Sequence, residues 1–182
     1  MRLLREYIRA LLAESIDPKI ASMIDRAEEA GHMIEVENGA VYLFDATRSE
    51  TRTSNIAAVQ WYSAGSNMFG PCLKAAHVNH SRALGNFGPL VYDVAIEVTG
   101  GLTPDRTEVS KDARGVWDYY MKRRPDVIKQ QLDNPRNRLT PEYEDNCSHP
   151  GRFSQKSSMS KKYSKTGTPV MDELRRRGML VE

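Results

Sequence analysis

The sequence predicts an α+β fold, a mostly antiparallel central sheet with flanking helices, and three observations support this. Four segments of strand character follow one another at residues 32–37, 40–45, 56–64 and 72–80. Asn38-Gly39 joins the first two, and this dipeptide between such segments is a strong signal for a β-hairpin. Residues 89–99 and 110–123 repeat apolar side chains at helical spacing. We therefore expect an antiparallel meander followed by helices.

The length of the chain favours one domain with appendages. Its 182 residues, 40% of them apolar, suffice for one sizeable core. We divide it into an amphipathic N-terminal helix at 1–14, a domain at 15–132, and a loop-rich basic region at 133–182 ending in a short helix at 170–177. No apolar stretch reaches the roughly 20 residues that a membrane-spanning helix needs, so we predict no membrane partner.

Capping residues mark the helices of the first half. Asp17 is a good N-cap, Pro18 suits the first helical position, and Gly31 ends this helix. The preceding helix, at residues 2–12, has an apolar side made by Leu3, Leu4, Tyr7, Ile8 and Leu11.

The second half is predicted from similar signals. Gly100-Gly101 ends the helix at 89–99, a short strand follows at 102–103, and Ser110 caps the helix that ends at Arg123. Pro125 should begin another helical stretch to about Leu132. Residues 133–163 lack periodicity and are predicted to be loop.

Charge and cysteine content restrict the partners and the compartment. Residues 151–182 carry 8 basic and 3 acidic side chains, whereas residues 15–100 carry 6 and 10. The basic end is either a nucleic-acid or other polyanion contact or simply a solvated tail. Two cysteines cannot form a secreted-type disulfide framework, so a reducing compartment is expected. Cys147 and His149 lack a second ligand pair at zinc-finger spacing, and we predict no metal site.

The loop at residues 81–88 has the composition of a phosphate-binding turn. Glycines allow backbone N–H groups to approach a pyrophosphate, and the following helix directs its positive end at the same charge. The alternative is a tight strand-to-helix turn without a ligand.

This loop resembles the signature of the GNAT superfamily of acyl-CoA-dependent N-acetyltransferases: Arg or Gln, two residues, Gly, one residue, then Gly or Ala. The resemblance implies that acetyl-CoA, as co-substrate, binds to Arg82, Gly85, Asn86, Phe87 and Gly88. Phe87 stands where the second small residue belongs, and Gly88 comes one position late. A side chain at Phe87 would crowd a close backbone approach.

A second resemblance covers roughly residues 70–147. The runs at 88–97, 100–106 and 116–120, with the later stretches at 131–133, 139–141 and 145–147, resemble GNAT-like proteins of tailed bacteriophages. Residues 1–14 also resemble the capsid-targeting sequences of T4-like phages. That likeness implies cleavage between Glu14 and Ser15; the alternative is an ordinary first helix packed on the domain.

The resemblance also indicates candidate catalytic residues. In catalytic members, the helix matching residues 110–123 often supplies a tyrosine that protonates the CoA thiolate. Trp117 aligns best with that position, and Tyr120, one turn on, could substitute. Alternatively, both pack the helix on the sheet. His77 is the candidate base; His80 is a second, and residues three apart in a strand should face opposite ways.

These expectations lead to two functions of different kinds. One is a phage GNAT-like enzyme that moves an acetyl group from acetyl-CoA to an amine in the host cytoplasm during infection. The other is a non-catalytic virion-packaged or structural protein that keeps the fold and contacts phage head components.

Overall fold

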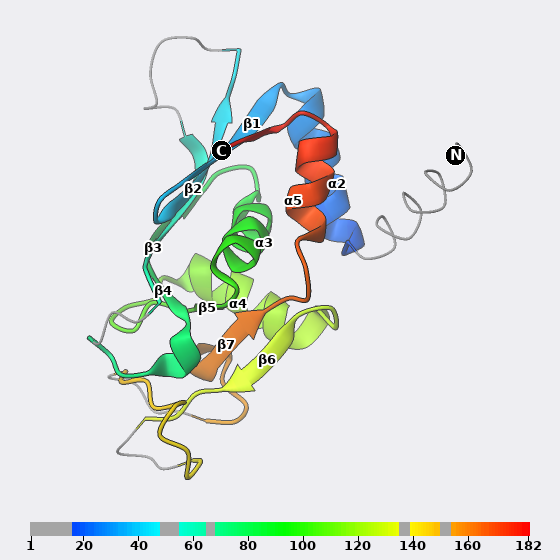
Figure 1. The fold of residues 1–182 in the computed structure, drawn as a ribbon. Helices are drawn as coiled ribbons and strands as arrows, with labels where there is room; N and C mark the ends of the chain where they lie inside the picture. Colours follow the sequence, from blue (N-terminus) through cyan, green and yellow to red (C-terminus); the bar gives the residue numbers. More distant parts are fainter. Residues whose placement is uncertain (1–15, 48–54, 65–67, 135–138, 150–153) are drawn as a thin grey trace.

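The computed structural model describes residues 16–47, 55–64, 68–134, 139–149 and 154–182 (Figure 1). The predicted helix at 2–12 and the cleavage point between Glu14 and Ser15 lie outside the described residues. Within them the chain forms helices α2 (Pro18–Glu29), α3 (Gly88–Thr99), α4 (Lys111–Arg123) and α5 (Pro169–Arg176), and one eight-stranded sheet. The α+β class is therefore confirmed.

The sheet has the strand order β6-β7-β5-β4-β3-β2-β1-β8. Its strands are β1 (His32–Glu37), β2 (Ala40–Asp45), β3 (Asn55–Tyr62), β4 (Ala76–Ala83), β5 (Leu102–Thr103), β6 (Ile128–Gln131), β7 (Lys161–Ser164) and β8 (Leu180–Val181). Strands β1 to β4 form the predicted antiparallel meander. The expectation of a mostly antiparallel sheet is wrong, because the sheet is mixed: β4 pairs with β5 and β1 with β8 in parallel. Each of these later strands follows a helix, which returns the chain so that it runs in the same direction.

Helix α3 forms the centre of the core. The sheet curls around it, and α2 and α5 lie beside it (Figure 1). Every residue from Gly88 to Glu97 is buried, which is why this helix is apolar on nearly all sides. Its two buried acids, Asp93 and Glu97, pair with Arg124 and Lys165.

The C-terminal region contributes to this same sheet. Strand β7 lies between β5 and β6, and α5 packs on α3. The helix predicted at 125–132 is wrong, because Ile128–Gln131 forms β6, where backbone pairing with β7 outweighs local propensity. Part of the stretch predicted as loop is likewise β7. The basic residue Arg177 is paired with Asp25 and Glu28 of α2.

The two cysteines form a disulfide, Cys72–Cys147, in a small apolar cluster separate from the main core. Leu132 completes the buried part of that cluster, and Phe69, Leu73 and Leu139 pack against it. In the described part of the chain, no helix has the length and apolar character needed to cross a membrane.

Candidate active site

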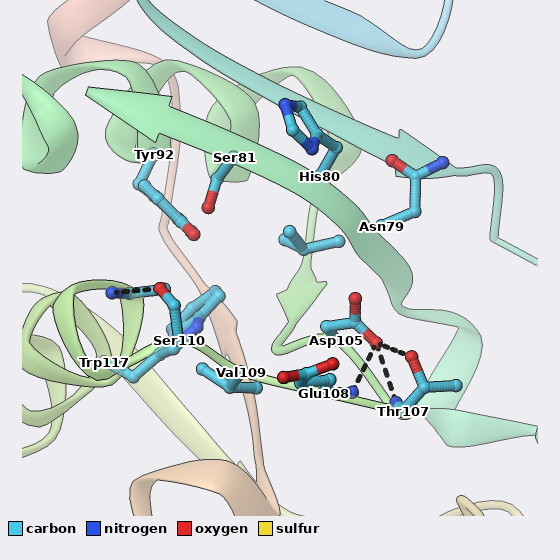
Figure 2. Close-up of a pocket in the computed structure, with 12 residues that line it drawn as sticks. Asn79, His80, Ser81, Tyr92, Asp105, Thr107, Glu108, Val109, Ser110 and Trp117 are labelled. Carbon is cyan, nitrogen blue, oxygen red and sulfur yellow. Dashed lines mark hydrogen bonds between the residues drawn. The ribbon is translucent and has the colours of Figure 1, made fainter.

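A cavity of about 310 Å³ opens where β4 and β5 separate. The two parallel strands pair only at Ala76–Leu102 and His77–Thr103. Beyond these positions β4 continues along β3, whereas the chain after β5 turns away at Pro104 into the loop that leads to α4. The cavity lies in the resulting gap, lined by β4 at residues 78–81, the loop at 105–110, and side chains from α3 and α4 (Figure 2).

Tyr92 of α3 brings a buried phenol to this cavity. Its ring packs edge-on against Trp117 of α4, with 4.9 Å between the ring centroids. The hydroxyl oxygen is buried and makes no hydrogen bond within the described residues. Burial raises the pKa of Tyr92 to about 12, to which Asp105 adds and which the nearby Ser81 hydroxyl partly offsets. Figure 2 shows the two hydroxyl groups on the cavity side of β4 and α3. Tyr92 is thus a neutral hydrogen-bond donor with an unused proton.

The opposite wall of the cavity is acidic. Asp105 Oδ1 accepts hydrogen bonds from the Thr107 amide (2.7 Å), the Thr107 hydroxyl (2.6 Å) and the Glu108 amide (3.3 Å). These bonds hold the start of the loop in one conformation. Glu108 is exposed and lies beside the cavity (Figure 2). Two carboxylates at one wall favour a cationic or amine ligand there.

The predicted catalytic residue Tyr120 lies in the core and is not among the cavity-lining residues. Its hydroxyl donates to Asp93 Oδ1 (2.5 Å) and also lies 2.8 Å from the Pro89 carbonyl oxygen. Burial, followed by the charge of Asp93, raises the pKa of Tyr120 well above its ordinary value. Trp117 does line the cavity, and its indole also stacks on Tyr163 at 5.0 Å.

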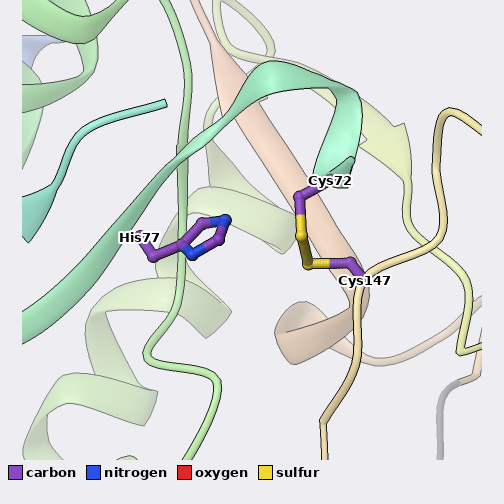
Figure 3. Close-up of side chains that lie close together, drawn as sticks. All are labelled: Cys72, His77 and Cys147. Carbon is purple, nitrogen blue, oxygen red and sulfur yellow. A yellow bond between two sulfur atoms is a disulfide. The ribbon is translucent and has the colours of Figure 1, made fainter. Parts of the chain in front are cut away.

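His77 also lies away from the cavity, beside the disulfide (Figure 3). Burial lowers the pKa of His77 to about 4, and the charge of Arg106 contributes. His80 lines the cavity, but its ring lies on the other side of β4 (Figure 2). The two histidines share one face of the sheet, contrary to expectation. His77 pairs with Tyr62 and His80 with Gln60, because a β-bulge at Asn79 shifts the alternation by one residue.

The loop predicted to bind acetyl-CoA follows β4 directly. Arg82, Gly85 and Asn86 are exposed, and Phe87 and Gly88 are buried. The Phe87 ring packs against His32, with 6.0 Å between the ring centroids, and beneath the Arg26 guanidinium at 4.8 Å. The side chain that was expected to crowd the loop is therefore packed into the protein.

The backbone of this loop presents several amides. Gly85 and Asn86 both have left-handed backbone conformations, with φ of 60° and 63°. Among the described residues, the amides of Gly85, Asn86 and Gly88 donate no hydrogen bond. Pro89, the next residue, has no N–H to offer. Three amides without a partner among the described residues therefore lie close together in the sequence at the start of α3, where backbone N–H groups commonly bind anions.

Sequence reasoning missed Tyr92, Ser81, Asp105 and Glu108 as cavity residues. A signal for Tyr92 was present, since it is the one phenol in α3. Asp105 and Glu108 gave no comparable signal, because their position depends on where β4 and β5 separate.

Compared with models of protein families, with curated protein sequences and with solved structures, the chain has no match.

Proposed function

We propose that the protein is an acyl-CoA-dependent N-acyltransferase of the GNAT-like type whose acyl group and amine meet in the cavity between β4 and β5. The observation that carries this proposal is Tyr92, a buried and unpartnered phenol facing the cavity. A buried donor without a partner costs about 1–3 kcal/mol of stability, and a ligand that accepts its hydrogen bond recovers this free energy.

The cavity suits the acyl end of the co-substrate rather than the whole molecule. Its volume of about 310 Å³ lies at the low end of small-molecule sites. An acylated pantetheine arm would enter it, and the pyrophosphate would lie at the amides of Gly85, Asn86 and Gly88. Arg82, exposed at the end of β4, supplies positive charge beside them.

Each polar residue of the cavity has a role in the proposed reaction. The neutral amine nitrogen attacks the thioester carbonyl, the C–S bond breaks, and CoA leaves as a thiolate. With a pKa of about 12, Tyr92 keeps its proton and stabilises the carbonyl oxygen as negative charge develops there. Glu108 and Asp105 attract the amine and accept the proton it loses, directly or through water.

Titration calorimetry with acetyl-CoA tests this proposal. We expect binding to the wild-type protein and at least tenfold weaker binding to Tyr92→Phe. Tyr143→Phe is the control, because Tyr143 is exposed and lies away from the cavity. Absence of heat with wild-type protein at millimolar acetyl-CoA would exclude the proposal.

The second candidate is a non-catalytic protein of the phage particle. Tyr120 favours it, because the phenol nearest the expected acid position is already bonded to Asp93 in the core. Mass spectrometry of purified particles distinguishes the two, since a packaged protein should appear as a chain that begins at Ser15. A protein found only in infected-cell cytoplasm would speak for the enzyme.

A further inference from the structure

The disulfide and His77 form a compact group of potential metal ligands. The Cys72 and Cys147 sulfur atoms and one His77 ring nitrogen all lie within 4.8 Å of one another. All three residues are buried, and Figure 3 shows the imidazole beside the sulfur pair. In a tetrahedral zinc site with Zn–S of about 2.3 Å and Zn–N of about 2.0 Å, ligand atoms lie roughly 3.5–3.8 Å apart. The three side chains therefore need only small rotations to bind one ion.

The imidazole is free to act as a ligand. His77 Nδ1 is buried and has no hydrogen-bond partner within the described residues, although the side chain is only 1% exposed. Buried polar atoms are satisfied in the great majority of cases, so an unpartnered nitrogen on this buried ring needs an explanation.

The backbone holds the two cysteines together without the S–S bond. The Cys72 amide donates to the Asn146 carbonyl (3.0 Å), and the Ser148 amide donates to the Phe69 carbonyl (2.6 Å). Gly70 packs so closely on the second segment that a Cβ there would lie 2.7 Å from the Asn146 oxygen. Reduction of the disulfide should therefore leave the sulfur atoms near their present positions.

We propose that Cys72, Cys147 and His77 form a zinc site when the disulfide is reduced, so that the same two sulfur atoms alternate between an S–S bond and a metal. A dithiol reductant transfers two electrons to the disulfide, which becomes two thiols while the reductant becomes a disulfide. Binding of Zn²⁺ then displaces the two thiol protons to solvent. A ligand set of two thiolates and one imidazole is typical of zinc.

A zinc site at these three residues differs from the expectation of no metal site. That expectation considered only Cys147 and His149, which are close in sequence. Cys72 lies 75 residues before Cys147 in the sequence, and His77 is close to Cys72. The three residues therefore come together only in the folded protein. In a reducing compartment, the metal-bound form would be the stable one.

Cobalt substitution of the full chain tests the site. We expect the protein, reduced with a dithiol and freed of reductant under anaerobic conditions, to bind one Co²⁺ per chain. The spectrum should show thiolate-to-cobalt charge transfer and the strong visible bands of tetrahedral Co²⁺, and one equivalent of Zn²⁺ should abolish both. The oxidised protein should show neither. Circular dichroism recorded on each sample reports whether the fold is intact.

Matched variants assign the ligands. His77→Ala should weaken Zn²⁺ binding at least tenfold in competition with a chromophoric chelator, and Cys72→Ser should remove most of the charge-transfer band. His80→Ala, on the same strand but exposed, should leave both unchanged. The proposal is overturned if the reduced wild-type protein shows no charge-transfer band, if His77→Ala binds as tightly as wild type, or if the reduced chain is unfolded with and without metal.

Discussion

The buried ion network around α3 allows a quantitative prediction. Asp93 Oδ1 and Oδ2 accept from the Arg124 guanidinium at 2.9 and 2.8 Å, and Oδ2 also lies 3.3 Å from Lys165 Nζ. Lys165 pairs in turn with Glu97 at 2.5 Å. The side chains of these four residues are at most 3% exposed. Arg124 also pairs with two more exposed carboxylates, Asp126 at 2.6 Å and Asp17 at 3.8 Å.

Asp93→Asn removes the fully buried carboxylate that contacts both cations, and leaves Arg124 paired with only the partly exposed Asp126 and Asp17. Breaking a buried pair from one side costs about 3–5 kcal/mol. Arg124→Met should cost a similar amount, because the buried Asp93 carboxylate loses both guanidinium hydrogen bonds and keeps only Lys165 as a cationic partner. The double variant removes both members of the buried Asp93–Arg124 pair, so we expect it to cost well below the sum of the two single changes, with a coupling free energy of about 2–3 kcal/mol.

Urea unfolding followed by circular dichroism measures all four stabilities. Asp172→Asn is the control, because its partner Arg175 is 43% exposed and such surface pairs contribute at most about 1 kcal/mol. If the double variant costs the sum of the single variants to within about 0.5 kcal/mol, the charges do not act as one network and the reasoning is wrong.

Three further predictions concern single side chains. Tyr92→Phe should leave the free energy of unfolding unchanged or raise it by up to about 1 kcal/mol, because no hydrogen bond is lost, whereas Tyr120→Phe should lower it by about 2–3 kcal/mol; urea unfolding of both compares them directly. Burial raises the pKa of Glu97 above 4.5 despite Lys165, so its contribution to stability is largest below that ordinary value and is lost as pH rises through the raised pKa. Lys165→Met should raise the pKa of Glu97 further, because the charge that favours the ionised carboxylate is removed. The variant should therefore lose more stability relative to wild type at about pH 8 than at about pH 5, and an equal loss at the two pH values would contradict this. Gly85→Ala should cost about 1–2 kcal/mol in thermal unfolding, since φ is 60° there and the new Cβ would lie 3.3 Å from the Phe87 ring.

The first half of the fold was readable from sequence because its signals are local. Asn38-Gly39, the cap at Asp17 and the apolar spacing of α3 each report on neighbouring residues, and β1, β2, α2 and α3 lie where these signals put them. The mixed sheet was not readable in this way. Strands β5 and β8 are two residues long and are defined by their partners rather than by composition. The same holds for β6, whose sequence Ile-Lys-Gln-Gln has no strong strand preference.

In the candidate site, too, the features with local sequence signals could be predicted and those set by strand pairing could not. The loop at 81–88 could be found from its glycines, but the bulge at Asn79 and the separation of β4 from β5 decide which side chains reach the cavity. A one-residue shift in a strand exchanges its two faces, and the sequence around Asn79 contains no local signal that predicts this shift. The Cys72, Cys147 and His77 group was missed for a related reason, since 75 residues separate the two cysteines.

The position of β7 between β5 and β6 bears on how the chain reaches its native state. Leu102 of β5 has Tyr163 as its partner on that side, and all of β6 pairs with residues 161–164. Strand β6 therefore cannot join the sheet until β7, about sixty residues downstream of β5, has left the ribosome and inserted between β5 and β6. Such long-range pairing has a large cost in loop entropy, so the meander should form early and the pairing of β5, β7 and β6 should limit the folding rate. Until then the exposed edge of β5 is open to other chains, and a slow ribosome or a late truncation would favour aggregation over folding.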